Sequence, residues 1–190
     1  AGTGNVRVAF TGSTTVPLIP VAPHSGDKVW WFGWGDELNP RLTRAFDLTK
    51  ASQPQLEAWM WYDTTNDVGA KMYGFWSVST DGGVTWQLTA EELIMGRSGG
   101  GDAARWIKQT VDLSAYAGRK VQVRFEAISY LGQPAYGFAL DDITVADIGY
   151  STDAETGDDG WVGAGFVRLM PLLPQQWTVQ VIELDGKKAT

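Results

Sequence analysis

Short runs of strand-forming residues, divided by glycine and proline at short intervals, constrain the fold of this chain more than any other feature. The 190 residues include 23 Gly and 8 Pro. The runs between them are rich in Val, Trp, Tyr, Phe and Thr, which favour strands and leave little room for helices. This pattern predicts an all-β fold.

The hydrophobic pattern within these runs locates the strands. In residues 121–128, Val, Phe and Ala alternate with Gln, Arg and Glu, so one face is buried and the other is wet. Residues 55–62 alternate too, but Trp59 and Trp61 lie on the second face, so we expect both faces of this strand to be covered. Further strands are expected at Val6 to Phe10, Lys28 to Trp34, Arg41 to Phe46, Lys71 to Ser79, Trp106 to Val111, Gly137 to Val145, Gly165 to Leu169 and Trp177 to Ile182.

The number of expected strands sets the architecture. About ten strands exceed what one open sheet usually holds without curling. We therefore predict a two-sheet antiparallel β-sandwich. Only two short helical turns are expected, at 90–94 and 113–116. Residues 1–23, with prolines at 17, 20 and 23, fit an N-terminal edge strand with an extended lead-in, or the tail of a preceding domain. Residues 24–190 are expected to form a single sandwich domain.

Charge and composition exclude several classes of partner. The formal net charge of -7 repels phosphate backbones, so nucleic acid is not an expected partner. The chain has no Cys, which excludes disulfides and thiolate metal sites. No apolar run approaches the roughly 18 residues of a membrane helix, so membrane insertion is not expected. The first residues lack the pattern of a signal peptide, so Ala1 is interpreted as a mature N-terminus or a fragment boundary.

The segment Ser79 to Trp86 (STDGGVTW) matches the S-x-D-x-G-x-T-W pattern of an Asp-box. In such a turn Asp81 can accept hydrogen bonds from turn amides, Gly83 can adopt positive φ, and Trp86 can fold back onto the hairpin. Ser79 and Thr85 complete the pattern. We predict a structural turn and not a catalytic site.

Two adjacent carboxylates interrupt an apolar strand at Asp141 and Asp142. Because neighbouring strand residues point to opposite faces, the two acids are not expected to share one role. A charge beside a core needs Arg or Lys, backbone amides, or a bound cation. With one His and no Cys, the cation that the composition permits is calcium, and Asp36 and Glu37 could supply further ligands. Paired surface turns are the alternative, and the acidic connector 151–160 is a weaker cation candidate.

Ten tryptophans raise the question of carbohydrate binding, because exposed indole faces stack on sugar rings. Trp30 and Trp34 lie on one expected strand and share a face, with Trp31 on the other. They are candidate ligand-binding residues. Packing between the sheets is the favoured alternative.

Catalytic motifs are missing from the sequence. His24 is the single histidine, so an H-E-x-x-H zinc site cannot be built. It follows Pro23 in the expected lead-in loop and is interpreted as a surface residue. Glu57 and Glu126 each fit the polar side of an alternating strand, which accounts for them without glycosidase chemistry. We predict that the chain is not an enzyme.

Several segments in a fixed order resemble one known family. They are Gly35 to Leu48 (GDELNPRLTRAFDL), Trp61-Tyr62-Asp63, the Asp-box, Val111 to Gly118 (VDLSAYAG), the strand Gly137 to Val145, Gly160-Trp161 and Gly165 to Arg168 (GFVR). Together they are similar to the non-catalytic module that follows the protease domain in the immune inhibitor A family of secreted metallopeptidases. The resemblance extends over about residues 26–182 and implies a jelly-roll sandwich akin to MAM domains.

The resemblance also implies a bacterial, extracellular setting and calcium near Asp36 and Asp142, with Glu37 and Asp141 beside them. The zinc-binding protease domain of the family is not in this sequence, so its activity is not carried over. Trp30-Trp31-Phe32 and the three glycines at 99–101 depart from the family pattern.

These observations predict a secreted, calcium-stabilised, non-catalytic accessory module that acts by binding or structural support. Its expected partner is a protein or polysaccharide surface, or its own protease domain. A carbohydrate-binding module is the first alternative. The second is a self-assembling extracellular protein in which the N-terminal strand pairs with the open edge of another subunit.

Overall fold

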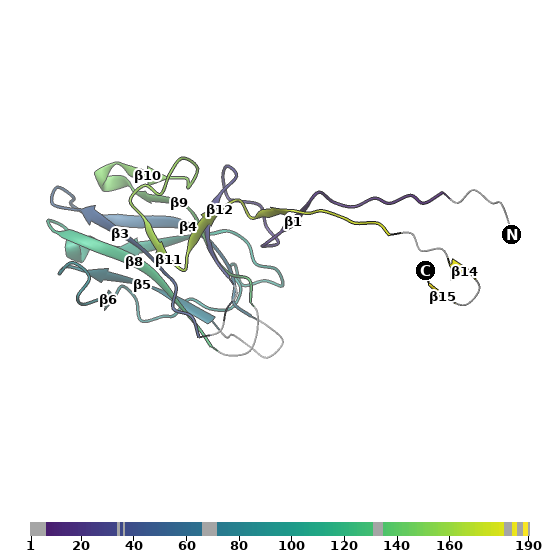
Figure 1. Cartoon of the computed structure of the whole chain (residues 1–190). Helices are drawn as coiled ribbons and strands as arrows, with labels where there is room; N and C mark the ends of the chain where they lie inside the picture. The colour runs from purple at the N-terminus through teal and green to yellow at the C-terminus, as the bar shows by residue number, and fades with distance from the viewer. Residues whose placement is uncertain are drawn as a thin grey trace.

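Two antiparallel sheets packed face to face form the body of the molecule (Figure 1). The computed structural model describes residues 7–33, 35, 37–65, 72–130 and 135–180, together with the backbone of two short strands near the C-terminus. The chain is all-β in these residues, apart from two single 3-10 turns. The prediction of a two-sheet antiparallel β-sandwich is confirmed.

The first sheet has six strands in the order β12-β2-β9-β4-β7, with β10 also paired to β9. The second has five, in the order β11-β3-β8-β5-β6. The strands of the first sheet are β2 (Val29–Phe32), β4 (Gln55–Asp63), β7 (Ile107–Asp112), β9 (Gly137–Val145), β10 (Tyr150–Thr152) and β12 (Val167–Leu169). Those of the second are β3 (Arg41–Asp47), β5 (Met72–Ser79), β6 (Gln87–Leu88), β8 (Lys120–Ser129) and β11 (Val162–Ala164).

Four short strands lie outside the sandwich sheets: β1 (Thr15–Pro17) pairs with β13 (Leu172–Pro174), and β14 (Leu184–Asp185) pairs with β15 (Lys188–Ala189). The 3-10 turns are η1 (Ser114–Tyr116) and η2 (Ala146–Ile148). No helix among the described residues has the length and apolar character needed to cross a membrane.

The core lies between the two sheets, where alternate residues of each strand meet. Strand β8 shows the alternation most clearly, since buried and half-buried residues follow each other along its length. The rings of Phe125 and Phe138, one from each sheet, lie 5.2 Å apart at their centroids and 68° to one another. Such edge-to-face packing of aromatic rings is typical of cores. The cluster also contains Trp30, Trp161 and Phe166.

Several predicted elements are corrected by the structure. Residues 7–10 form no strand, nor do residues 177–180; Val6 and residues 181–182 lie outside the described residues. Residues 90–94 form no helical turn, because Ile94 and Gly74 exchange two backbone hydrogen bonds of 2.8 Å and so form a β-bridge. The strands β6, β10, β11, β13, β14 and β15 were not expected, and the N-terminal strand β1 lies at 15–17 instead of 6–10.

The two ends of the described chain leave the sandwich together. Residues 7–17 and 172–180 run side by side away from its body, and we call this pair of segments the arm (Figure 1). Strands β1 and β13 form its base, with Val16 opposite Leu173. All six residues of these two strands are exposed.

Candidate functional site

The outer face of the six-stranded sheet, which is turned away from the second sheet, is partly covered by residues 18–25, which we call the strap. The strap carries Ile19, whose side chain is 1% exposed. Farther along the strap, the carbonyl of Ala22 accepts a hydrogen bond of 2.9 Å from the indole N–H of Trp106. The strap therefore adds a second, smaller apolar cluster to the molecule. The buried members of this cluster are Ile19, Val29, Trp61 and Ala139.

His24 fixes the end of the strap to the sheet. Its imidazole is stacked on the indole of Trp59, with ring centroids 3.9 Å apart and 17° between the planes. Its Nδ1 lies 2.5 Å from Oδ2 of Asp142. The hydroxyl of Ser25 donates to the other oxygen of that carboxylate over 2.8 Å. Stacking and hydrogen bonds together hold this segment against β4 and β9.

Asp141 is buried, with 1% of its surface exposed, and its partners are backbone amides. Its Oδ2 accepts the N–H groups of His24 at 3.0 Å and Ser25 at 3.1 Å, and its Oδ1 accepts that of Asp142 at 2.8 Å. Burial removes water from the carboxylate and raises the pKa of Asp141 to about 6. Peptide dipoles stabilise this buried acid in place of a Lys or Arg.

A β-bulge explains why both carboxylates reach the strap. The pairing of β4 with β9 shifts register between Glu57 and Trp59. At this point Asp142 has φ of 45°, in the left-handed region. A bulge re-aims side chains that regular alternation would send to opposite faces. The expectation that Asp141 and Asp142 serve separate faces was therefore wrong.

Glu37 does not join these carboxylates. Its side chain is exposed, and the turn that carries it is tied to the end of β8, because Leu38 N–H donates to the Ser129 hydroxyl over 3.0 Å. That hydroxyl in turn donates to the carbonyl of Gly35 over 2.9 Å. Asp36 lies outside the described residues. Within the described ranges, no group of three or more His, Asp or Glu side chains is arranged to hold a metal ion.

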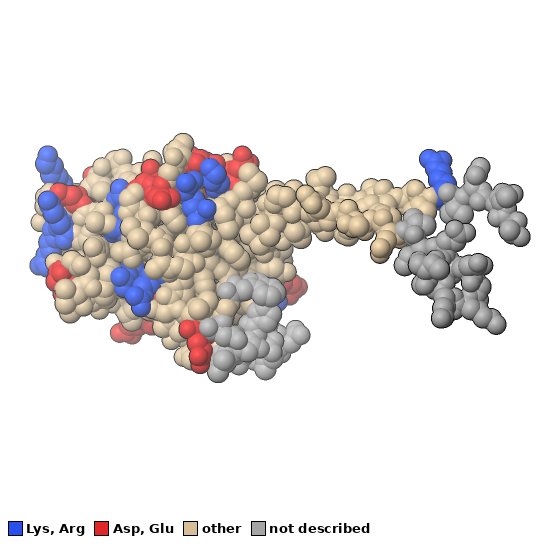
Figure 2. Space-filling view, in the orientation of Figure 1, with Lys and Arg blue, Asp and Glu red and all other residues tan. Residues whose placement is uncertain are grey.

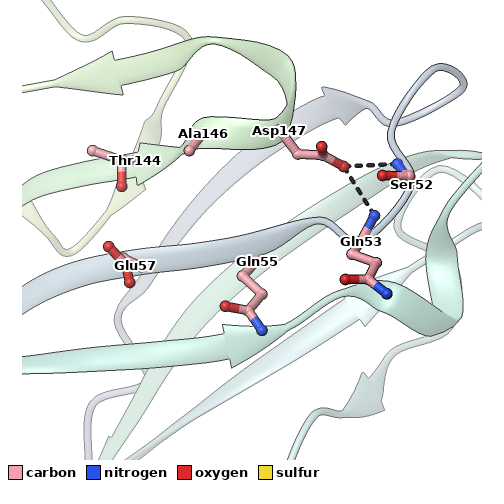
Figure 3. A pocket seen from close by; sticks show the side chains of 7 residues that line it. All are labelled: Ser52, Gln53, Gln55, Glu57, Thr144, Ala146 and Asp147. Carbon is pink, nitrogen blue, oxygen red and sulfur yellow. Dashed lines mark hydrogen bonds between the residues drawn. The ribbon is translucent and has the colours of Figure 1, made fainter.

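A surface pocket of about 520 Å³ lies on the polar part of the outer face (Figure 3). One wall is the loop before β4, which Asp147 holds by accepting the N–H groups of Ser52 at 2.7 Å and Gln53 at 3.0 Å. Its lining offers amide, hydroxyl and carboxylate groups, which both donate and accept hydrogen bonds. The lining residues are Ser52, Gln53, Gln55, Glu57, Thr144, Ala146 and Asp147.

A second hollow of about 280 Å³ borders the first through Thr144. The acidic connector forms much of its wall, including Asp153 and Asp159, and Asp142 lies at its edge. The hydroxyl of Thr152 donates a hydrogen bond to Asp159. The outer face thus presents a polar strip that runs from the strap to the connector. The strip consists of the residues that line these two hollows.

Of the two tryptophans that were candidates for sugar stacking, the one that the structure describes is not exposed on this face. Trp30 is 4% exposed and packs in the core between the sheets, so its ring faces are unavailable to a ligand. Trp34 lies outside the described residues. Trp59, on β4, is half-buried, and one of its faces is covered by His24.

The Asp-box turn is closed by its own side chains. Asp81 accepts hydrogen bonds from the N–H of Val84 at 3.0 Å and from the N–H and hydroxyl of Thr85 at 2.9 and 2.6 Å. These bonds favour the charged carboxylate and lower the pKa of Asp81. Gly83 has φ of 93°, and its carbonyl accepts the indole N–H of Trp86 at 3.0 Å.

The turn also connects β5, which ends at Ser79, with β8. Ser79 donates its hydroxyl to Asp81 at 2.7 Å and accepts the N–H of Gly83 at 2.8 Å. The guanidinium of Arg124, on β8, lies 3.6 Å from the ring centroid of Trp86. The polar side-chain groups of Ser79, Asp81, Thr85 and Trp86 thus all have partners within the turn, which lies on the five-stranded sheet, apart from the strip.

Sequence reasoning missed the part that His24 plays. It was interpreted as a surface residue in a lead-in loop, whereas 118 residues separate it from its partner Asp142. The available signal was the pair Trp59 and Trp61 on the second face of their strand. That pair predicted a covering for this face without identifying the strap.

Comparison with known proteins identifies the family. The family model "Immune inhibitor A-like, MAM domain" matches residues 4–170. The pre-pro-metalloprotease PrtV of Vibrio cholerae serotype O1 (strain M66-2) is 25% identical over 157 residues, which cover 78% of this chain and 16% of that protein. Immune inhibitor A of Bacillus thuringiensis subsp. alesti is 30% identical over 146 residues, which cover 71% of this chain and 20% of that protein. The chain thus spans a fifth or less of the length of these relatives. It belongs to the family of immune inhibitor A-like MAM domains.

Proposed function

We propose that this chain is a non-catalytic accessory module of a secreted bacterial metallopeptidase-like protein, and that it supports the peptidase domain by binding it. The observation that carries the proposal is the family match over residues 4–170, together with relatives that are named as a metalloprotease and as immune inhibitor A. The match spans a fifth or less of those relatives, which leaves room for a peptidase domain elsewhere in their chains.

The arrangement around His24 supports a structural role for this residue. In a hydrolytic triad one imidazole nitrogen faces the carboxylate and the other faces the nucleophilic hydroxyl. Here the Ser25 hydroxyl donates to the same Asp142 carboxylate that His24 contacts. The imidazole therefore lies beside the hydroxyl without activating it, and the three side chains fasten the strap.

The polar strip supports a contact with protein more than one with polysaccharide. Gln53, Gln55 and Glu57 offer hydrogen-bonding groups around a hollow of about 520 Å³. A sugar platform on the strip would need an accessible indole face there, whereas Trp30 is buried and His24 covers one face of Trp59. A surface of amides and carboxylates suits the polar rim of a protein interface.

Calcium stabilisation remains part of the proposal. What supports it is that Asp141 is buried next to Asp142, and that among the described ion pairs neither carboxylate has a Lys or Arg partner. A cation beside Asp142 would offset this charge. Glu37 is placed elsewhere, so the ligand set expected from the sequence does not assemble among the described residues.

The proposal is tested with the reading frame that encodes this chain. We expect a peptidase domain with an H-E-x-x-H motif in the same polypeptide and measurable binding between that domain, expressed alone, and this chain in isothermal titration. Gln55→Ala with Glu57→Ala should weaken binding, while Gln122→Ala, on the other sheet, should not. A reading frame without a zinc motif, or no heat of binding, would overturn the proposal.

The polysaccharide alternative has its own measurement. In a pull-down with insoluble chitin and cellulose, we expect the chain to stay in the supernatant. Retention on either polymer that is lost in the Gln55→Ala, Glu57→Ala variant would place a sugar on the strip and replace the peptidase domain as partner.

A further inference from the structure

Strand β7 lies at one edge of the six-stranded sheet. In the described part of the chain, β4 is the only strand that pairs with it, and the pairing covers all six positions of β7. Its residues Lys108, Thr110 and Asp112 are exposed. An unpaired strand edge is a template on which another chain can form a strand. The backbone of β7 and the surface beside it decide which chain this edge can accept.

The direction of the backbone groups along β7 follows from a hydrogen bond at its end. The N–H of Leu113 donates to the carbonyl of Pro54 over 2.9 Å, and these two residues continue the register of the strand pair. In an antiparallel pair, successive residues turn their backbone groups alternately toward the partner and away from it. Val111 is therefore bonded to β4, whereas Thr110 turns its N–H and C=O outward, as do the residues two positions before and after it.

A hollow of about 410 Å³ runs beside this edge. Four consecutive residues of β7, 109–112, line it, so the hollow borders the edge of the strand as well as one face. Much of the remaining lining comes from residues 89–95, which the two bonds between Ile94 and Gly74 tie to the other sheet. Leu93 and Met95 in this segment are 40% and 47% exposed. The hollow thus lies between the edge of one sheet and an apolar segment of the other.

A strand added to β7 would send every second side chain into the hollow. Val111 and Gln109 pair with Leu56 and Ala58 of β4, which are core residues, so this face of β7 is turned toward the space between the sheets. The side chains of an added strand alternate in the same way, so those opposite Val111 and Gln109 would meet Leu93. Main-chain bonds to an edge, with space for alternate side chains, are a common way of binding an extended peptide.

Charges restrict the sequence of such a peptide. Figure 2 shows no acidic or basic side chain along the arm between the sandwich and its far end, whereas the β7 edge carries charges at defined positions. Asp112 and Glu92 both line the hollow, and neither takes part in a described ion pair. Lys108 is already bonded to Glu57 over 3.0 Å. Because opposite charges across an antiparallel pair are stabilising, a basic residue suits the position opposite Asp112.

A second copy of β7 suits this edge less well than a separate peptide does. With a two-fold axis at Thr110, Lys108 of one copy would face Asp112 of the other, which is favourable. Gln109 of each copy would then face Val111 of the other, so an amide would enter the hollow at one of the two positions that favour an apolar side chain. Placing an amide against apolar side chains costs free energy unless it is hydrogen-bonded.

We infer that the edge of β7 and the hollow beside it form a binding site for an extended peptide segment of a partner protein. The segment adds an antiparallel strand to the six-stranded sheet, with apolar side chains opposite Val111 and Gln109 and a basic side chain opposite Asp112. This site shares no lining residue with the strip, and it does not depend on the proposed peptidase partner.

Fluorescence anisotropy with a labelled peptide of sequence TKVTVT tests this inference. Its lysine is placed to face Asp112 and its two valines to face Val111 and Gln109. Thr110→Pro removes an outward N–H that β4 does not use, a position where edge strands tolerate proline, and we expect the dissociation constant to rise by about tenfold or more. Thr110→Ala is the matched control: it keeps this N–H and should leave the dissociation constant within about twofold of the parent.

Two further arms separate the backbone from the hollow. The peptide TKVPVT lacks the N–H that faces the carbonyl of Thr110 and should bind at least about tenfold more weakly than TKVTVT. Leu93→Glu places a charge on the lining without altering β7 and should weaken the binding of TKVTVT by a similar factor, with urea denaturation to confirm that the variant folds.

The absence of TKVTVT binding to the parent chain would overturn the inference. So would equal dissociation constants for the parent and Thr110→Pro, since the edge would then not be used. Sedimentation equilibrium of the parent alone gives the third contrary outcome: a dimer that Thr110→Pro dissociates would assign this edge to a second copy in place of a partner peptide.

Discussion

The imidazole of His24 lies between an indole and a carboxylate, stacked on Trp59 at 3.9 Å and bonded to Asp142 at 2.5 Å. This contact joins the strap to the centre of the six-stranded sheet. It holds residues 18–25 over the apolar part of the outer face and leaves the polar strip beside it. The geometry of the candidate site therefore depends on a residue that the sequence pattern assigned to a loop.

Replacing His24 with Ala should loosen the strap. The variant loses one aromatic stacking contact and one hydrogen bond to a carboxylate, so we expect the free energy of unfolding to fall by about 1–3 kcal/mol. Urea denaturation followed by tryptophan fluorescence measures the change. Lys50→Ala, at an exposed position, is the control and should unfold as the parent does. Equal midpoints for both variants would contradict the role of His24.

The buried carboxyl of Asp141 should titrate near pH 6, well above its ordinary value of 3.8. Between these two values the folded chain binds more protons at this group than the unfolded chain does. The contribution of Asp141 to stability is therefore greatest at low pH and declines as the pH rises through about 6.

Carbon-detected NMR of the Asp carboxyl groups gives the midpoint directly. For the pH dependence, the free energy of unfolding of the parent minus that of Asp141→Asn should fall between pH 4 and pH 6, because the amide does not titrate. A difference that is flat or rises over this interval would count against the raised pKa.

Substitution of Trp30 should act on stability. Because this side chain lies in the core, Trp30→Ala is expected to cost about 3–5 kcal/mol in unfolding free energy. Trp30→Phe should cost less, since the indole N–H is buried without a hydrogen-bond partner and the smaller ring removes it. Thermal melts of the two variants compare them. A Trp30→Ala chain as stable as the parent would show that the residue is not a core residue.

Calcium should raise the melting temperature if the negative charge near Asp142 holds the ion. A ligand that binds only the folded state adds about 2.7 kcal/mol when its concentration is a hundred times its dissociation constant. We expect the melt in millimolar calcium to lie above the melt in a chelator, and the difference to vanish in Asp142→Asn. Identical melts of the parent in both conditions would remove calcium from the proposal.

Local alternation predicted the centre of the fold well. Strand β8 extends over 120–129, where the expected strand was 121–128, and β9 has the expected bounds. In β8 the buried residues recur at every second position, as the alternation of the sequence predicts, whereas the first five residues of β9 are all buried. The sequence is less informative about which face of a strand meets the core. It placed Trp30 and Trp31 on opposite faces but did not show which of the two faces inward.

Long-range pairing is what the sequence could not show. A strand was expected at residues 6–10 from its Val and Phe, yet the pairing forms at 15–17 with 172–174, where proline spoils the local pattern. The strap illustrates the same limit, because the carboxylates that bond to His24 and Ser25 are 116–118 residues away. The bulge at Asp142 changes the direction in which one side chain points, and regular alternation along the sequence cannot predict such a bulge.

The strap has a mechanical consequence. It joins the arm to β2, so tension that draws the first segment of the arm outward passes along residues 18–25 before it reaches the sandwich. The load then falls on the hydrogen bonds of His24 and Ser25 to Asp141 and Asp142, which share it because they act in parallel. Breaking these hydrogen bonds would expose Trp59 and Trp106 while both sheets stay paired. A pull on this module would thus uncover an aromatic surface before it unfolds the protein.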